Sequence, residues 1–307
     1  MACRAPAPAE RGSIDVPFCT GVRALDGLLT IGRGARVGFF GAPGAGKTTL
    51  LETIASGAQG DAVVLALVGE RGREAQRWSA RVDARTAIVC ATADCCAAER
   101  VRAADVAMTQ AQSLRERGLD VVLIVDSLAR FVAALRERRV SYGEPLGRAG
   151  FPPAVWADLG RYLERAGATR RGSITLLATV LTDGDDDRDP VAEAARSLLD
   201  GHIVLSLALA RAGHFPAIDV PASVSRTMAE VVSPDLAADA DIVRTALSLL
   251  AQTEEARALG FVDGSDTKLA AACRAEQALL DFLRQRGPAP LAETQRALRT
   301  LANALRA

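Results

Sequence analysis

A glycine-rich stretch near the N-terminus constrains this chain more than any other feature of its 307 residues. It has the spacing G-x-x-x-x-G-K-T, follows the apolar segment 36–40 and precedes the helix-like segment 50–55. Strand, glycine loop and helix in this order form a phosphate-binding loop, in which backbone N–H groups and the helix N-terminus face one polyphosphate. The residues predicted to bind a nucleotide are Gly41, Ala42, Pro43, Gly44, Ala45, Gly46, Lys47, Thr48 and Thr49.

Two residues of this loop have distinct expected roles. Lys47 can reach the β- and γ-phosphates, and the Thr48 hydroxyl can ligate Mg²⁺. The alternative is an ordinary glycine-rich turn, which would not require every fixed position of the motif together with the right flanks. We therefore expect ATP and Mg²⁺ as cofactors.

Composition and charge narrow the classes of function that remain possible for the chain. Hydrophobic residues make up 49% of the chain, which is ample for a packed core. Lys plus Arg and Asp plus Glu both number 37. Nucleic acid is therefore disfavoured as the main partner, because binding a phosphate backbone usually needs a concentrated positive face. The six cysteines and two histidines lack zinc-ligand spacing, and no stretch resembles a signal peptide or a membrane span. We expect a soluble, cytosolic protein.

Strand-like and helical segments alternate through residues 21–233, which we interpret as the ATP-binding catalytic domain. The strand candidates are apolar on both faces, which is typical of a parallel sheet covered by helices on both sides. They are residues 36–41, 62–69, 86–91, 121–126, 173–181 and 202–205. The predicted fold class is therefore α/β.

The two ends of the chain differ from this central part. Residues 1–20 are rich in Ala, Pro and Arg and are interpreted as a disordered or extended lead-in. Residues 234–307 carry Ala and Leu at helical spacing without a strand signal, which predicts a small helical domain. Its expected helices are residues 236–259, 267–286 and 291–307.

Two carboxylates follow predicted strands directly. Asp126 ends the segment 121–126, and Glu70 follows the segment 62–69. Ligands bind at the carboxyl ends of parallel strands, so Asp126 is expected near the Mg²⁺ held by Thr48. Glu70 is the candidate that orients the attacking water. The alternatives are a helix-capping Asp126 and a solvated turn at Glu70.

Arg226 follows a short apolar and hydroxyl segment, residues 222–225. Its planar, permanently charged guanidinium suits a developing phosphoryl charge. Periodicity alone favours an ordinary surface arginine at this position.

Six motifs occur in order from about residue 14 to residue 228: GAPGAGKTTL, LVGERGRE, VLIVDSLARF, GEPLGRAGFPPAVW, TVLTDGDDDRDPVAEAARSLLDGHIVLS and AGHFPAIDVPASVSR. Together they resemble the ATPases of type III secretion systems and, equally, those of the flagellar export apparatus. They resemble the catalytic subunits of rotary ATP synthases more distantly. The resemblance implies a RecA-like P-loop NTPase core with a small C-terminal helical domain.

The resemblance also implies roles for single residues. Glu70 matches the water-activating glutamate, and Arg71 and Arg130 match arginines near the γ-phosphate. Asp126 matches the Walker B aspartate. Arg226 matches the arginine finger that enters the site of a neighbouring subunit. Phe261 falls where the family often has a tyrosine stacked on adenine.

Glu70 and Arg226 occur in one chain, which suggests a homohexamer whose identical subunits complete one another's sites. The resemblance implies further partners: export chaperones, secreted substrates, stalk and regulator proteins, and the export gate at the cytoplasmic face of the inner membrane. It implies no nucleic-acid partner. The rival hypotheses are a ring-shaped RNA translocase and a nucleotide-binding scaffold without turnover. The RNA translocase would predict basic pore loops. The scaffold without turnover would predict loss of the water-activating glutamate, which is present here as Glu70.

One part of the family pattern differs. Members carry an N-terminal β-barrel before the segment that resembles residues 14–21, whereas here only a short tail precedes it. The expectation is a truncated or naturally shortened form, whose ability to assemble and hydrolyse ATP alone is open.

Overall fold

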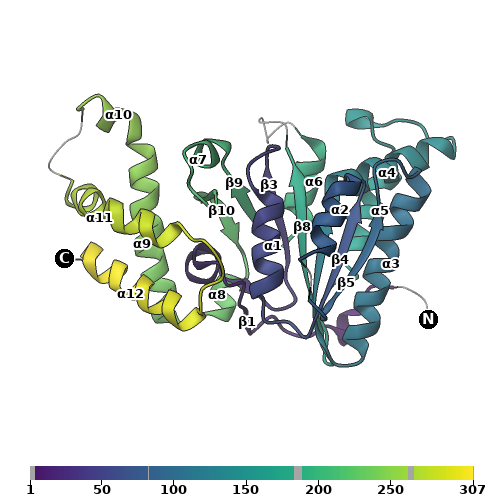
Figure 1. The fold of residues 1–307 in the computed structure, drawn as a ribbon, viewed down its shortest axis with the longest axis horizontal. Helices are drawn as coiled ribbons and strands as arrows, with labels where there is room; N and C mark the ends of the chain where they lie inside the picture. The colour runs from purple at the N-terminus through teal and green to yellow at the C-terminus, as the bar shows by residue number, and fades with distance from the viewer. Residues whose placement is uncertain (1–3, 82, 183–188, 262–265, 307) are drawn as a thin grey trace.

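A mainly parallel sheet forms the centre of the computed structural model, which describes residues 4–81, 83–182, 189–261 and 266–306 (Figure 1). Its strands are β3 (Arg36–Gly41), β4 (Ala62–Val68), β5 (Thr86–Ala91), β6 (Asp120–Asp126), β7 (Gly167–Ala168), β8 (Ser173–Leu181), β9 (Gly201–Leu205) and β10 (Ile218–Ser225). Their order is β10-β9-β3-β8-β6-β4-β5, with β7 paired to β8. Only the β10–β9 and β7–β8 pairs of this described sheet are antiparallel. The predicted α/β class is confirmed.

Helices cover both faces of the sheet because its inner strands are apolar on both sides. The helices are α1 (Lys47–Gly57), α2 (Gly72–Ser79), α3 (Ala97–Glu116), α4 (Leu128–Ser141), α5 (Pro153–Leu163), α6 (Pro190–Leu198), α7 (Leu207–Arg211) and α8 (Met228–Val231). Leu65 and Leu67 of β4 belong to one buried cluster with residues of α1 and α2. Val64 and Ala66 belong to a second cluster with residues of α3, α4, α5 and α6. This alternation follows from the two-residue period of a strand.

The last four helices of the described residues lie beside the β10 edge of the sheet (Figure 1). They are α9 (Pro234–Gln252), α10 (Glu254–Ala258), α11 (Thr267–Leu283) and α12 (Leu291–Arg306). The predicted helix 236–259 is divided at Thr253, whose hydroxyl donates to the carbonyl of Leu249 (2.7 Å). A hydroxyl bonded back to the preceding turn competes with the regular helix. Buried residues of α9, α11 and α12 share one hydrophobic cluster with α1 and β3.

The lead-in predicted for residues 1–20 is anchored where the structure describes it. The short β1 (Pro17–Phe18) pairs with β2 (Ile31–Gly32), and the Phe18 side chain is buried in the core. Arg11 forms an ion pair with Glu164 (2.5 Å) at the end of α5. Within the ranges that the structure describes, no helix combines the length and apolarity that crossing a membrane requires.

Candidate nucleotide-binding and catalytic site

The glycine loop lies between the end of β3 at Gly41 and the start of α1 at Lys47. Gly46 precedes α1 with a φ of 89°, a left-handed conformation that residues with a Cβ rarely adopt. The buried Lys47 ammonium donates to the carbonyl oxygens of Gly41 and Ala42, the second at 2.8 Å. The predicted order of strand, loop and helix is therefore present, with its lysine held within the loop.

Asp126 ends β6, and β8 lies between β6 and β3. Thr179 of β8 donates its hydroxyl hydrogen to Asp126 Oδ1 (2.7 Å). Burial raises the pKa of Asp126, and the bond from Thr179 and the charge of Lys47 partly oppose this rise. Burial disfavours the charged form of a carboxylate, and a nearby cation stabilises that charged form.

The donor atoms at this edge fit Mg²⁺. The half-buried Thr48 follows Lys47 in α1, and Asp126 lies at the same end of the sheet. A hydroxyl and a carboxylate are hard oxygen donors, and Mg²⁺ is commonly bound by one or two protein groups together with substrate phosphates. Thr48 and Asp126 therefore stay the proposed magnesium ligands.

Glu70 lies two residues beyond the end of β4 and is buried. Arg130 of α4 places its Nε 3.2 Å from Glu70 Oε1 and also donates to the carbonyl of Gly69. Burial raises the pKa of Glu70 to about 8, with further upward contributions from Glu74 and Asp126 that the charge of Arg130 opposes. A pKa in this range suits a general base near neutral pH.

The neighbouring strands explain why the two carboxylates approach each other. Leu67 of β4 is paired with Asp126 of β6, so Glu70 extends past the same edge of the sheet. Arg71, next to Glu70, occupies the N-cap position of α2 without a side-chain capping hydrogen bond and is exposed. The structure thus gathers Glu70, Arg130 and Asp126 at the edge where the glycine loop begins.

Arg226 is not brought to this edge. Ser225 of β10 is paired with Gly201 of β9, which is paired with Val37 near the start of β3. The Arg226 side chain is exposed and donates to the carbonyl of Arg196 (3.3 Å). Arg226 therefore lies at the end of the sheet opposite the glycine loop of its own chain.

Two phenylalanines are candidates for contact with a nucleotide base. Phe261, the predicted one, follows α10 and is 78% exposed. Phe215, which was not predicted from the sequence, is 47% exposed, and a Cβ built on Gly46 would lie 3.7 Å from its Cε1. The sequence signal for Phe215 is an aromatic residue directly before Pro216 within the motif AGHFPAIDVPASVSR.

The chain is similar in sequence to known proteins over most of its length. Residues 21–225 match the family model described as ATP synthase alpha/beta family, nucleotide-binding domain. A type 3 secretion system ATPase of Sinorhizobium fredii is 47% identical over 288 residues, 92% of this chain and 64% of that protein. A flagellum-specific ATP synthase of Salmonella typhimurium is 41% identical over 286 residues, 91% of this chain and 63% of that protein. The chain thus spans less than two thirds of the length of either curated relative.

Solved structures extend the likeness to three dimensions. The assembled ATPase EscN of the enteropathogenic E. coli type III secretion system has a TM-score of 0.94 and 39% identity, covering 97% of this chain and 74% of that chain. EscN in complex with its central stalk EscO has a TM-score of 0.91 and 38% identity, with the same coverage. The resemblance predicted from the six motifs is confirmed.

Proposed function

We propose that this chain, which belongs to the ATP synthase alpha/beta family, hydrolyses ATP to energise protein export by a bacterial type III secretion system. The observation that carries the proposal is the buried Glu70 carboxylate, paired with Arg130 at the sheet edge where the glycine loop begins. A nucleotide-binding scaffold without turnover has no need of a carboxylate whose burial costs free energy. The relatives named as type III secretion ATPases give the branch of the family.

Each residue of this edge has a role in in-line hydrolysis. The backbone N–H groups of the loop and the Lys47 ammonium bind the phosphates, and Arg71 and Arg130 add positive charge near the γ-phosphate. Glu70 accepts a hydrogen bond from the attacking water and orients it. Bound Mg²⁺, held by Thr48 and Asp126, would neutralise charge on the β- and γ-phosphate oxygens.

Arg226 acts on a neighbouring subunit in this proposal. Its distance along the sheet from its own glycine loop leaves the site of one chain without that guanidinium. An arginine finger supplied in trans accelerates phosphoryl transfer by about 10³–10⁵-fold where it has been measured. A closed homohexamer of identical subunits would give every site one finger.

The domains and partners follow from the family. Residues 21–233 form the catalytic domain, and residues 234–307 form a helical domain that faces chaperones. Rounds of ATP hydrolysis release chaperones and unfold substrates for export, at the cytoplasmic face of the inner membrane beside the export gate. A stalk protein is supported by the complex of EscN with EscO, and regulator proteins complete the apparatus. Nucleic acid has no role.

The test is steady-state phosphate release from ATP by the wild type, Lys47→Ala and Glu70→Gln. We expect magnesium-dependent turnover in the wild type and its loss in both variants, with nucleotide binding kept in Glu70→Gln. Turnover that persists in both variants would reject the proposed site. A flagellar role is the second candidate, given the 41% identity to a flagellum-specific ATP synthase. Complementation of strains lacking either ATPase separates the two roles, and filter binding of labelled RNA tests the translocase alternative.

A further inference from the structure

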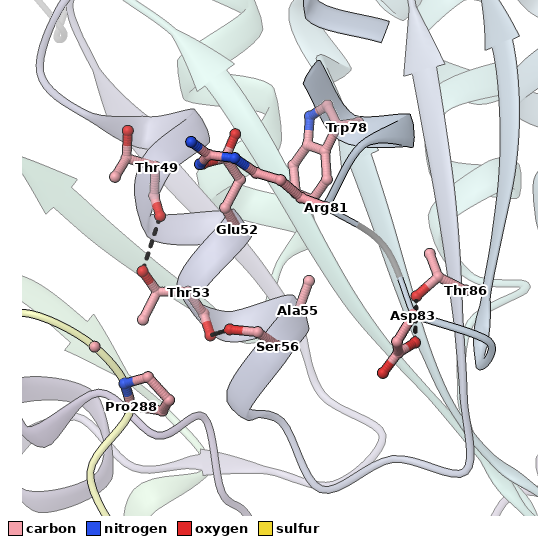
Figure 2. A pocket seen from close by; sticks show the side chains of 11 residues that line it. Thr49, Glu52, Thr53, Ala55, Ser56, Trp78, Arg81, Asp83, Thr86 and Pro288 are labelled. Atoms are coloured by element: carbon pink, nitrogen blue, oxygen red, sulfur yellow. Dashed lines mark hydrogen bonds and ion pairs between the residues drawn. The ribbon is translucent and has the colours of Figure 1, made fainter. Parts of the chain in front are cut away.

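A pocket of about 320 Å³ lies between α1 and α2. Its α1 wall runs from Thr49 to Ser56, its other wall includes Trp78 and Arg81, and Pro288 also lines it (Figure 2). Trp78 of α2 belongs to the same buried cluster as Leu51 and Ile54 of α1, but the pocket separates the two helices beside that contact. A side chain that bridges this gap can therefore add to the contacts that set their relative position.

Glu52 is that bridge. Its side chain projects from α1 and is only 7% exposed, although it carries a carboxylate. Arg77 places its Nε 2.7 Å from Glu52 Oε1, and Arg81 contacts Glu52 Oε2 closely. Arg77 lies in α2 and Arg81 lies just beyond its end, four residues later, on the same face. Both arginine side chains, 46% and 56% exposed, place their guanidinium groups against the one buried carboxylate.

The bridge connects the two halves of the site. Helix α1 begins at Lys47, five residues before Glu52, and α2 begins at Gly72, two residues after Glu70. We propose that Glu52 is a positioning residue: by holding Arg77 and Arg81 it fixes α2 against α1, and so fixes Glu70 relative to the bound nucleotide. The inference rests on the proposed ATPase function for its kinetic consequence. A misplacement of reacting groups by about 1 Å can cost about 10²-fold in rate.

The first test is the kinetics of Glu52→Gln, which keeps the shape of the side chain and removes its charge. Asp239→Asn is a matched control, because Asp239 of α9 is also 7% exposed and pairs with two arginines, Arg299 and Arg306, of α12. We expect kcat to fall about tenfold in Glu52→Gln, because a displacement of Glu70 smaller than about 1 Å costs less than the full factor of about 10². The KM for ATP and the thermal midpoint should stay close to the wild type. Asp239→Asn should keep the wild-type kcat.

Glu52→Leu is the second variant, which keeps the test decisive if Glu52→Gln does not fold. Leucine fills a similar volume without a buried charge, and both arginines can reach water, so stability should be kept. A kcat within about twofold of the wild type in folded Glu52→Gln and Glu52→Leu would overturn the inference, as would an equal loss in the control.

A second readout does not depend on ATP. Trp78 is 2% exposed and lies in α2 beside the bridge, and the only other tryptophan of the chain is Trp156. In a Trp156→Phe background, acrylamide quenching of Trp78 should rise in Glu52→Gln and stay unchanged in Asp239→Asn. Unchanged quenching in both would contradict the bridge itself. If turnover of the wild type did not depend on Lys47, the proposed function would be contradicted instead. The quenching of Trp78 alone would then test the bridge.

Discussion

Arg226 and Lys47 lie at opposite ends of the central sheet of one chain. Ser225, next to Arg226, is aligned through Gly201 with Val37 near the start of β3, whereas Lys47 follows the end of that strand. The four residue steps from Val37 to Gly41 alone separate these levels by about 13 Å at the usual strand rise. A phosphoryl group held by Lys47 can therefore meet this guanidinium only if a second copy supplies it.

Mixing two inactive variants tests this arrangement. Lys47→Ala keeps Arg226, and Arg226→Ala keeps the glycine loop, so a mixed ring contains some interfaces with both groups. We expect each variant alone to be inactive, the mixture to regain part of the phosphate release, and the specific activity of the wild type to rise with protein concentration. A mixture no faster than the sum of its parts, with a flat concentration dependence, would count against shared sites.

The pKa of Glu70, raised to about 8 by burial, predicts the pH dependence of turnover. A water-orienting base acts as the carboxylate, and lowering the pH through about 8 protonates it. We therefore expect kcat/KM, which reports the free enzyme, to rise between about pH 6 and pH 9. The magnesium-dependent initial rate across this range is the measurement, and a flat profile would contradict the assignment.

Glu70 should also lower stability at high pH. Its folded-state pKa lies above the ordinary 4.5, so the folded protein holds the proton more tightly, and stability is lost as pH rises from about 4.5 to 8. Glu70→Gln removes this cost. Its thermal midpoint should exceed that of the wild type above pH 8, by about 2–4 °C for each kcal/mol recovered in a large domain. Calorimetry at about pH 5 is the control, because there the difference should largely vanish.

The ring of Phe215 beside Gly46 predicts a contribution to nucleotide affinity. Aromatic stacking contributes about 0.5–1.5 kcal/mol beyond area burial, so Phe215→Ala should raise the KM for ATP by about 2–10-fold with a small effect on kcat. Phe261→Ala, measured beside it, tests whether the more exposed ring also stacks. An effect confined to Phe261→Ala would assign the base contact to that residue instead.

The sequence predicted the parts of the site that follow buried strands. The apolar runs that end at Gly41 and Asp126, and the run before Glu70, are continuous enough to show where each strand stops. Strand β10 was not predicted, because Pro221 and a register shift between Asp219 and Val224 break its two-residue period. The bridge at Glu52 could not be predicted either. Its arginines lie 25 and 29 residues away, and no local pattern relates residues at that separation.

The end of α11 and the nucleotide loop are joined through Phe215. The backbone N–H of Gln285, just beyond α11, donates to the carbonyl oxygen of Phe215 (2.9 Å), and the Gln285 side chain donates to the carbonyl of Gly21. A force that pulls α11 away from the sheet must break this link or drag the aromatic ring off Gly46. Because that ring lies beside the nucleotide loop, the hydrogen bond that attaches the end of α11 also couples the position of this helix to the loop.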